Sequence, residues 1–172
     1  MRFILIDRVL KMEKGKEALL IKNVSNSEDY FSDHFPGSPI MPGSLILEGF
    51  EQASHLLIGF SLDFSFSPVL RRISNGKFKR FVRPGDQLQL HVRLVDEGQE
   101  AAQVKAKAQV DGKTMAEATL HFTLVDAKED EEAGRACRRL KEFYELLTAD
   151  PVKDAWESWS MQGSRRGASD VL

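Results

Sequence analysis

A chain of 172 residues suits one domain with room for an appendage, and it is long enough to bury a substantial core. Its apolar fraction of 42% and charged fraction of 29% are ordinary for a soluble globular protein, and a net charge of -2 predicts no global attraction to nucleic acid or acidic membranes. The single cysteine, Cys137, excludes an internal disulfide framework and fits a reducing compartment.

The N-terminal apolar run is interrupted by Asp7 and Arg8, so it is too short for a signal peptide. No stretch of the sequence approaches the roughly 20 apolar residues of a membrane span. We therefore expect a cytoplasmic protein.

The first part of the chain predicts a β-hairpin followed by an irregular loop. Residues 3–12 alternate loosely, residues 17–24 form a second apolar run, and Lys14-Gly15-Lys16 supplies a turn between them. Residues 25–35 are polar and irregular, and the prolines and glycines of residues 36–43 block regular structure.

Residues 44–60 have the spacing of a helix that is apolar around most of its circumference, which predicts burial. The polar exceptions, Glu48, Glu51, Gln52 and His55, lie at i, i+3, i+4 and i+7 and form one stripe. The helix therefore presents one polar face.

Four strand-like segments follow, over residues 73–82, 87–95, 102–110 and 114–124. The Asp111-Gly112 pair predicts a tight hairpin turn. A long buried helix followed by consecutive antiparallel strands indicates an α+β fold with a sheet wrapped on a helix.

Composition changes at Asp126, so we divide the chain into a domain over residues 1–126 and an extension over residues 127–172. Apolar side chains at helical spacing predict a helix over residues 129–147. Its predicted packing face comprises Ala133, Ala136, Cys137, Leu140, Phe143, Tyr144 and Leu147. Trp156 and Trp159 suggest another short packed element, and residues 163–172 read as a loose tail.

His34 opens the Pro/Gly-rich loop, and Glu48 follows inside the apolar helix. An imidazole and a desolvated carboxyl group are the usual partners for proton transfer near neutral pH. A charge among Leu45, Ile46 and Leu47 is costly unless it has a partner or a role. His34 and Glu48 are therefore the candidate catalytic pair.

The residues around this pair strongly resemble the bacterial 3-hydroxyacyl-[acyl-carrier-protein] dehydratases of the FabZ type, over about residues 1–125. The matching motifs are His34-Phe35-Pro36-Gly37, Pro39-Ile40-Met41-Pro42-Gly43, Leu45-Ile46-Leu47-Glu48 with Gln52, Lys77-Phe78 and Pro84-Gly85-Asp86-Gln87-Leu88. The resemblance implies a hotdog fold, a long central helix wrapped by a curved antiparallel sheet, in a homodimer with shared active sites or a trimer of dimers.

The resemblance also implies the site roles. His34 is the base at C2 of the substrate, and Glu48 of the partner subunit protonates or orients the leaving hydroxyl group. The Gly43 N–H can point at the thioester oxygen from a helix N-terminus, and Gln52 can orient the Glu48 carboxyl group. The resemblance implies a reaction without a metal or redox cofactor, on a substrate that carries phosphopantetheine. The sequence has no Cys/His metal spacing and no glycine-rich nucleotide loop that would indicate otherwise.

Cations gather in one segment with no acidic residue between Leu70 and Arg83. They are Arg71, Arg72, Lys77, Lys79, Arg80 and Arg83. The segment is either a solvated strand edge or a dock for an acidic acyl carrier protein and its phosphate. No motif for reading or stacking on nucleic acid accompanies it.

The chain departs from the FabZ pattern at Asp33, where glycine is usual, and near Glu51, so the acyl chain length it prefers is open. Two other readings stay open: a hotdog acyl thioesterase, and a non-catalytic module that binds carrier protein. We interpret Glu51 and His55 as part of a solvated helix face and not as catalytic residues, and His91 and His121 as structural residues.

Overall fold

The computed structural model describes residues 4–35, 37–98 and 100–149. Within these residues, six strands form one antiparallel sheet in the order β1-β2-β4-β5-β6-β3. The strands are β1 (Arg8–Glu13), β2 (Glu17–Asn23), β3 (Phe66–Phe78), β4 (Gln87–Glu97), β5 (Ala101–Val110) and β6 (Lys113–Asp126). The helices are the 3₁₀ helix η1 (Asp29–Phe31), α1 (Gly43–Ser61) and α2 (Glu131–Thr148).

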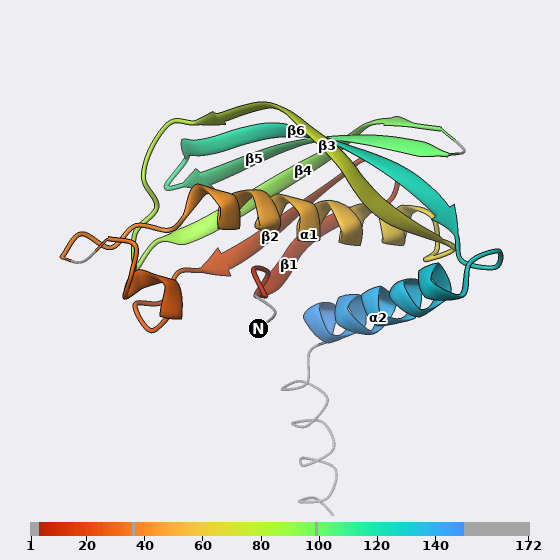
Figure 1. The fold of residues 1–172 in the computed structure, drawn as a ribbon, viewed down its shortest axis with the longest axis horizontal. Helices are drawn as coiled ribbons and strands as arrows, with labels where there is room; N and C mark the ends of the chain where they lie inside the picture. The colour runs from red at the N-terminus through yellow and green to blue at the C-terminus, as the bar shows by residue number, and fades with distance from the viewer. Residues whose placement is uncertain (1–3, 36, 99, 150–172) are drawn as a thin grey trace, which may run out of the picture.

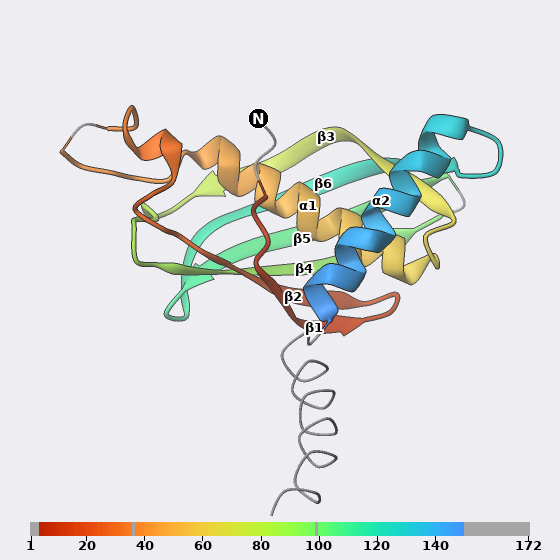
Figure 2. The ribbon, with the colours of Figure 1, turned by 90° about the horizontal axis from the view of Figure 1, so that it is seen from below.

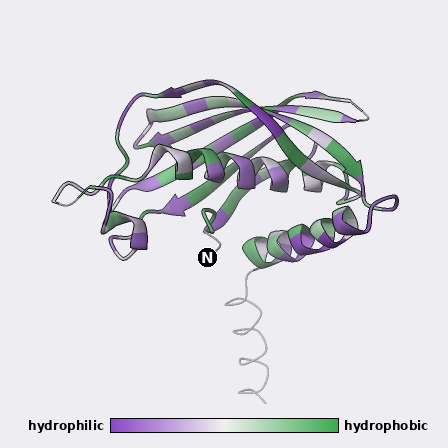
Figure 3. Cartoon of the chain, viewed as in Figure 1, coloured by the Kyte–Doolittle hydropathy of each residue, from purple (hydrophilic) through white to green (hydrophobic). Residues whose placement is uncertain are grey.

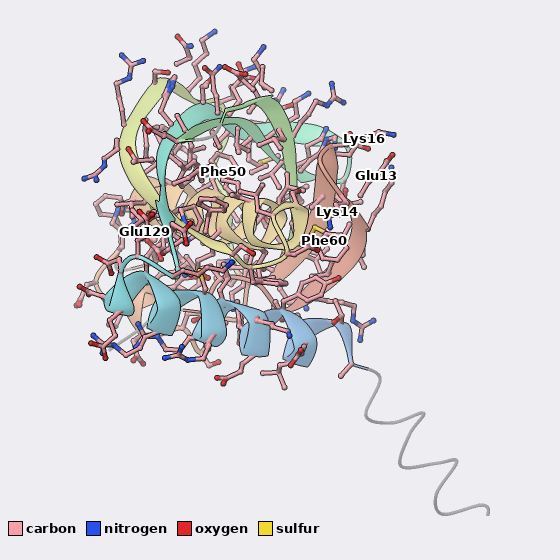
Figure 4. The ribbon with its side chains drawn as sticks, turned by 90° about the vertical axis from the view of Figure 1, so that its right-hand side faces the viewer. Glu13, Lys14, Lys16, Phe50, Phe60 and Glu129 are labelled. Carbon is pink, nitrogen blue, oxygen red and sulfur yellow. The ribbon has the colours of Figure 1, made fainter. Side chains whose placement is uncertain are left out.

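Helix α1 lies in the concavity of the curved sheet (Figures 1 and 2). Its Phe50, Ala53, Leu56 and Leu57 side chains are fully buried, and the inward-facing residues of β4 to β6 are buried opposite them. Phe50 is enclosed between α1 and the sheet (Figure 4). The expected hotdog fold, a sheet wrapped around a long apolar helix, is confirmed.

Helix α1 and the strands from β4 to β6 follow the sequence prediction closely, but β1 begins at Arg8 rather than near residue 3, and β3 differs more. The strand begins at Phe66 and ends at Phe78, whereas the apolar pattern predicted residues 73–82. Pro68 lies inside the strand because β3 is at the edge of the sheet, where a missing N–H is tolerated. The predicted Asp111-Gly112 turn forms, with positive φ angles of 48° and 73° at its two residues.

Helix α2 forms close to its predicted bounds and begins after Asp130, whose carboxylate accepts a hydrogen bond from the Ala133 N–H at 2.8 Å. It lies on the side of α1 opposite the sheet (Figures 1 and 2), and its residues alternate between hydrophobic and hydrophilic along the helix (Figure 3). Cys137 is buried, and the Tyr144 ring stacks on Phe60 with centroids 5.1 Å apart. Burial of this face explains why the helix is stable, because an isolated helix of this length is marginal.

The predictions for Trp156, Trp159 and residues 163–172 lie outside the described residues. In the part of the chain that is described, no helix is both long enough and apolar enough to cross a bilayer.

Candidate active site

The loop that carries His34 is held to the sheet at its base. Lys22 of β2 is buried, and its ammonium group lies 2.8 Å from the Glu28 carboxylate at the start of the loop. The His34 N–H donates to Tyr30 O at 3.1 Å, and the Ile40 N–H donates to His34 O at 3.1 Å. The peptide bond from His34 to Phe35 is cis. These contacts fix His34 although its loop has little regular structure.

One hydrogen bond orients the imidazole of His34. Its Nδ1 lies 3.0 Å from the carbonyl oxygen of Ile40. A carbonyl oxygen only accepts, so Nδ1 carries the proton and Nε2 of the neutral ring keeps its lone pair. The ring is therefore oriented by Ile40, while Asp33, the departure from the FabZ pattern, is exposed. Nε2 is the atom that can take a proton.

His34 lines a cavity of about 760 Å³ at the N-terminal end of α1. Gly43, the first residue of α1, also lines this cavity. The first N–H groups of a helix have no partner within it, and no side chain caps this helix end. The Phe78 ring lies against Gly43, so that a Cβ there would meet Phe78 Cε1 at 2.9 Å. The cavity is thus lined both by an imidazole and by a helix N-terminus that has no side-chain cap.

Glu48 is held by a second chain of hydrogen bonds. The Gln52 amide donates from Nε2 to Glu48 Oε1 at 2.8 Å, and Gln52 Oε1 accepts from the Leu5 N–H at 3.0 Å. A backbone N–H only donates, so it forces the amide oxygen of Gln52 toward Leu5 and the NH₂ toward Glu48. Glu48 Oε1 is thereby an acceptor, and Oε2 is the oxygen that can hold a proton.

His34 and Glu48 are placed on different sides of α1. Ile46 lines the cavity of His34, whereas Glu48 is not among its lining residues. Glu48 follows Ile46 by two positions, which at 3.6 residues per turn is about 200° around the helix. Within this chain, Glu48 therefore does not share the cavity that His34 lines.

Glu51 and His55 extend the polar face of α1 beyond Glu48. Both are half-buried, and His55 Nε2 lies 3.7 Å from Glu51 Oε1. Burial, and then the nearby Glu48 carboxylate, raise the pKa of Glu51 above its ordinary value. The predicted polar stripe is thus partly enclosed rather than fully solvated.

The cationic segment is divided by the structure. Only Lys79, Arg80 and Arg83 line the cavity of His34. Arg71 and Arg72 are exposed on β3, and Lys77 lies 3.8 Å from the Glu117 carboxylate, which also pairs with Lys79 at 3.0 Å.

Three contributors to the site were not predicted from sequence. Lys113 and the exposed Phe81 line the cavity of His34, and the backbone N–H of Leu5 anchors Gln52. The Asp-Gly turn before Lys113 was visible in the sequence, but only folding brings its tip to α1.

His91 and His121 lie in strands, away from His34. His91 Nε2 is 3.2 Å from Glu17 Oε2, and His121 Nε2 is 2.8 Å from Ser74 Oγ. Among the residues described, no group of three or more His, Cys, Asp or Glu side chains is arranged to hold a metal ion.

The sequence matches the family described as FabA-like domain over residues 1–119. The 3-hydroxyacyl-[acyl-carrier-protein] dehydratase FabZ of Symbiobacterium thermophilum is 43% identical over 132 residues, which cover 76% of this chain and 93% of that protein. The match of residues 1–119 ends before α2 begins.

Solved structures resemble the fold at low identity. The dehydratase heterocomplex ApeI:P of Xenorhabdus doucetiae gives a TM-score of 0.59 at 14% identity, covering 70% of this chain and 82% of that chain. A hypothetical thioesterase of Streptococcus pneumoniae with coenzyme A gives 0.57 at 18% identity, covering 69% and 88%. Dehydratases and thioesterases share this fold, so the fold alone does not choose between the two activities.

Proposed function

Because this chain belongs to the family of FabA-like domains, we propose that it dehydrates 3-hydroxyacyl-[acyl-carrier-protein] to the trans-2-enoyl product, in the biosynthesis of fatty acids or related lipids. The observation that carries the proposal is the likeness to curated FabZ dehydratases at over 40% identity across nearly their whole length. The oriented His34 and Glu48 supply the two proton-transfer groups that the reaction needs.

His34 is the base of the proposed reaction. Its Nε2 takes the proton from C2 of the substrate, since Nδ1 is occupied with Ile40. The electron pair of the C2–H bond forms the C2–C3 double bond. Negative charge builds on the thioester oxygen in the transition state, and we assign its stabilisation to the Gly43 N–H, because Gly43 is the first residue of α1 and no side chain caps this helix end.

Glu48 of the partner subunit is the acid. The C3–O bond breaks as Oε2 of this carboxyl group delivers its proton, and the hydroxyl group leaves as water. Glu48 does not line the cavity of His34 and lies about 200° around α1 from Ile46, which does, and this supports a site shared by two protomers. The proton gained by His34 then returns to Glu48 through water, so the cycle is balanced in protons. Loss of water involves no net oxidation or reduction, so the cycle needs no redox cofactor.

The acyl carrier protein is the proposed macromolecular partner. Lys79, Arg80, Arg83 and Lys113 line the cavity of His34, where they suit an acidic protein and the phosphate of its phosphopantetheine arm. Arg71, Arg72 and Lys77 lie outside this cavity, so they make at most the periphery of the dock.

The test measures the enoyl product and the free acid formed from 3-hydroxyacyl thioesters. We expect the enoyl product, and His34→Ala or Glu48→Ala should each lower its rate by roughly 10²–10⁴-fold. Free acid in its place would identify a thioesterase, and turnover of neither kind would indicate a binding module.

A mixing experiment tests the shared site. His34→Ala and Glu48→Ala proteins should each be nearly inactive, but heterodimers refolded from both would contain one site with both groups intact. Partial recovery of activity supports the arrangement, whereas proven subunit mixing without recovery contradicts it.

A further inference from the structure

A second cavity, of about 350 Å³, lies between α1, the start of β3 and α2. Helix α1 contributes Gln52 and His55 to its wall, and β3 contributes Ser67 and Pro68. Ile4 also lines it, and α2 contributes three apolar residues and one cation, which are Ala136, Leu140, Phe143 and Arg139. The α2 side of the cavity is therefore mainly apolar. Its volume is at the lower end of the range for small-molecule sites.

This cavity lies on the same side of α1 as Glu48. Gln52 and His55 follow Glu48 by four and seven positions, which keeps them within about 40° of it around the helix. Gln52 also joins the two features directly, since it lines the cavity and donates to Glu48 Oε1 at 2.8 Å. If the C3 hydroxyl group of a substrate contacts Glu48, the rest of its acyl chain can therefore extend along α1 into this cavity.

Helix α2 closes the far end of that space. Leu140 sits over Gly59, where a Cβ would meet Leu140 Cδ2 at 2.8 Å, and Tyr144 stacks on Phe60. Along α1, Gly59 is about 16 Å beyond Glu48. Leu140 lines the cavity and also packs on Gly59, so α2 forms the wall of the cavity on the side away from Glu48.

We propose that this cavity receives the end of the acyl chain and that α2, through Ala136, Leu140 and Phe143, sets the longest chain that the enzyme accepts. The inference rests on the proposed function. It goes beyond that function because the residues that limit the chain come from a helix outside the FabA-like match.

Two substitutions in α2 test the proposal in opposite directions. Ala136→Leu fills the cavity, and Leu140→Ala enlarges it. Leu146→Ala is the matched control, because Leu146 is on the same helix and is 72% exposed. Thermal unfolding of each variant establishes that it is folded.

The first measurement compares kcat/KM for 3-hydroxybutanoyl, 3-hydroxyoctanoyl and 3-hydroxyhexadecanoyl thioesters. Ala136→Leu should lose activity toward the longer chains, by about fourfold for each methylene excluded, and leave the butanoyl substrate unaffected. Leu140→Ala should shift the preference toward longer chains, and Leu146→Ala should change nothing. Rates that change in parallel for all chain lengths, or do not change, would overturn the inference while leaving the dehydratase function standing.

The second measurement does not depend on turnover. Binding of alkyl pantetheine thioethers of increasing length should tighten about fourfold per methylene and then level off. The length at which it levels off should fall in Ala136→Leu and rise in Leu140→Ala. The same levelling length in all variants would refute the role of α2, whether or not the protein proves to be a dehydratase.

Discussion

Two hydrogen bonds of Gln52 to described residues, Leu5 and Glu48, have different consequences, and two substitutions of similar size separate them. Gln52→Leu removes both bonds. Gln52→Glu keeps an oxygen that accepts from the Leu5 N–H but loses the donor to Glu48. The melting temperature should depend on the hydrogen bond to Leu5, and kcat should depend on the hydrogen bond to Glu48.

The structure gives the size of each effect. Leu5 is 1% exposed, so Gln52→Leu leaves its N–H without a partner at a cost of about 1–3 kcal/mol. For a chain of this length each kcal/mol lowers Tm by roughly 2–4 °C, which predicts a fall of about 2–12 °C. A misplaced acid costs up to about 10²-fold in rate, so kcat should fall by that order while KM changes little.

Gln52→Glu should keep most of the Tm but make the rate depend on pH. Two carboxyl groups at hydrogen-bond distance cannot both ionise without repulsion, so the pair holds its shared proton to a higher pH than an isolated carboxyl group would. The pH at which kcat of this variant falls should therefore lie above that of the wild type.

The assay pairs thermal unfolding with kcat on a short pantetheine thioester, which avoids any effect on carrier-protein docking. Ser54→Ala is the matched control, since the Ser54 hydroxyl is also buried on α1 but donates to Phe50 O. Wild-type kcat in Gln52→Leu, or an equal loss of Tm in Gln52→Glu and Gln52→Leu, would refute the division of roles.

Three further predictions concern the cationic rim, Glu51 and α2. Arg80→Glu with Arg83→Glu should slow turnover of carrier-protein substrates far more than of the pantetheine thioester, with a strong salt dependence; equal losses on both would place these arginines in the acyl site. Burial and the Glu48 charge raise the pKa of Glu51, so the folded protein binds this proton more tightly than the unfolded chain, and the associated stability is lost as pH rises above the ordinary value of 4.5. Glu51→Gln should therefore raise Tm at neutral pH but not below that value, and a Tm difference independent of pH would contradict this. Deleting α2 and all that follows it should lower Tm and expose Phe60 of α1 to a hydrophobic dye; unchanged melting and dye binding would show that α2 is dispensable.

The sequence by itself determined the elements whose signals are local. The apolar periodicity of residues 44–60 specified α1, the Asp111-Gly112 pair specified a turn, and the spacing from Ala133 to Leu147 specified α2. The run from His34 to Glu48 pointed to acid–base chemistry through its residue types, and the FabZ resemblance of that run agrees with the curated relatives. Each of these signals depends only on near neighbours in the chain.

Only the tertiary structure decided how those elements share space. Periodicity could not place the start of β3 at Phe66, because the tolerance of Pro68 depends on which strand ends up at the edge of the sheet. It could not separate Lys79, Arg80 and Arg83 from the rest of the cationic segment. The earlier cations of this segment lie on β3, which pairs with β6, and they are outside the cavity of His34. Long-range contacts choose among arrangements that look equivalent locally, and for that reason the anchoring of Gln52 by Leu5 and the cavity closed by α2 appear only in the folded chain.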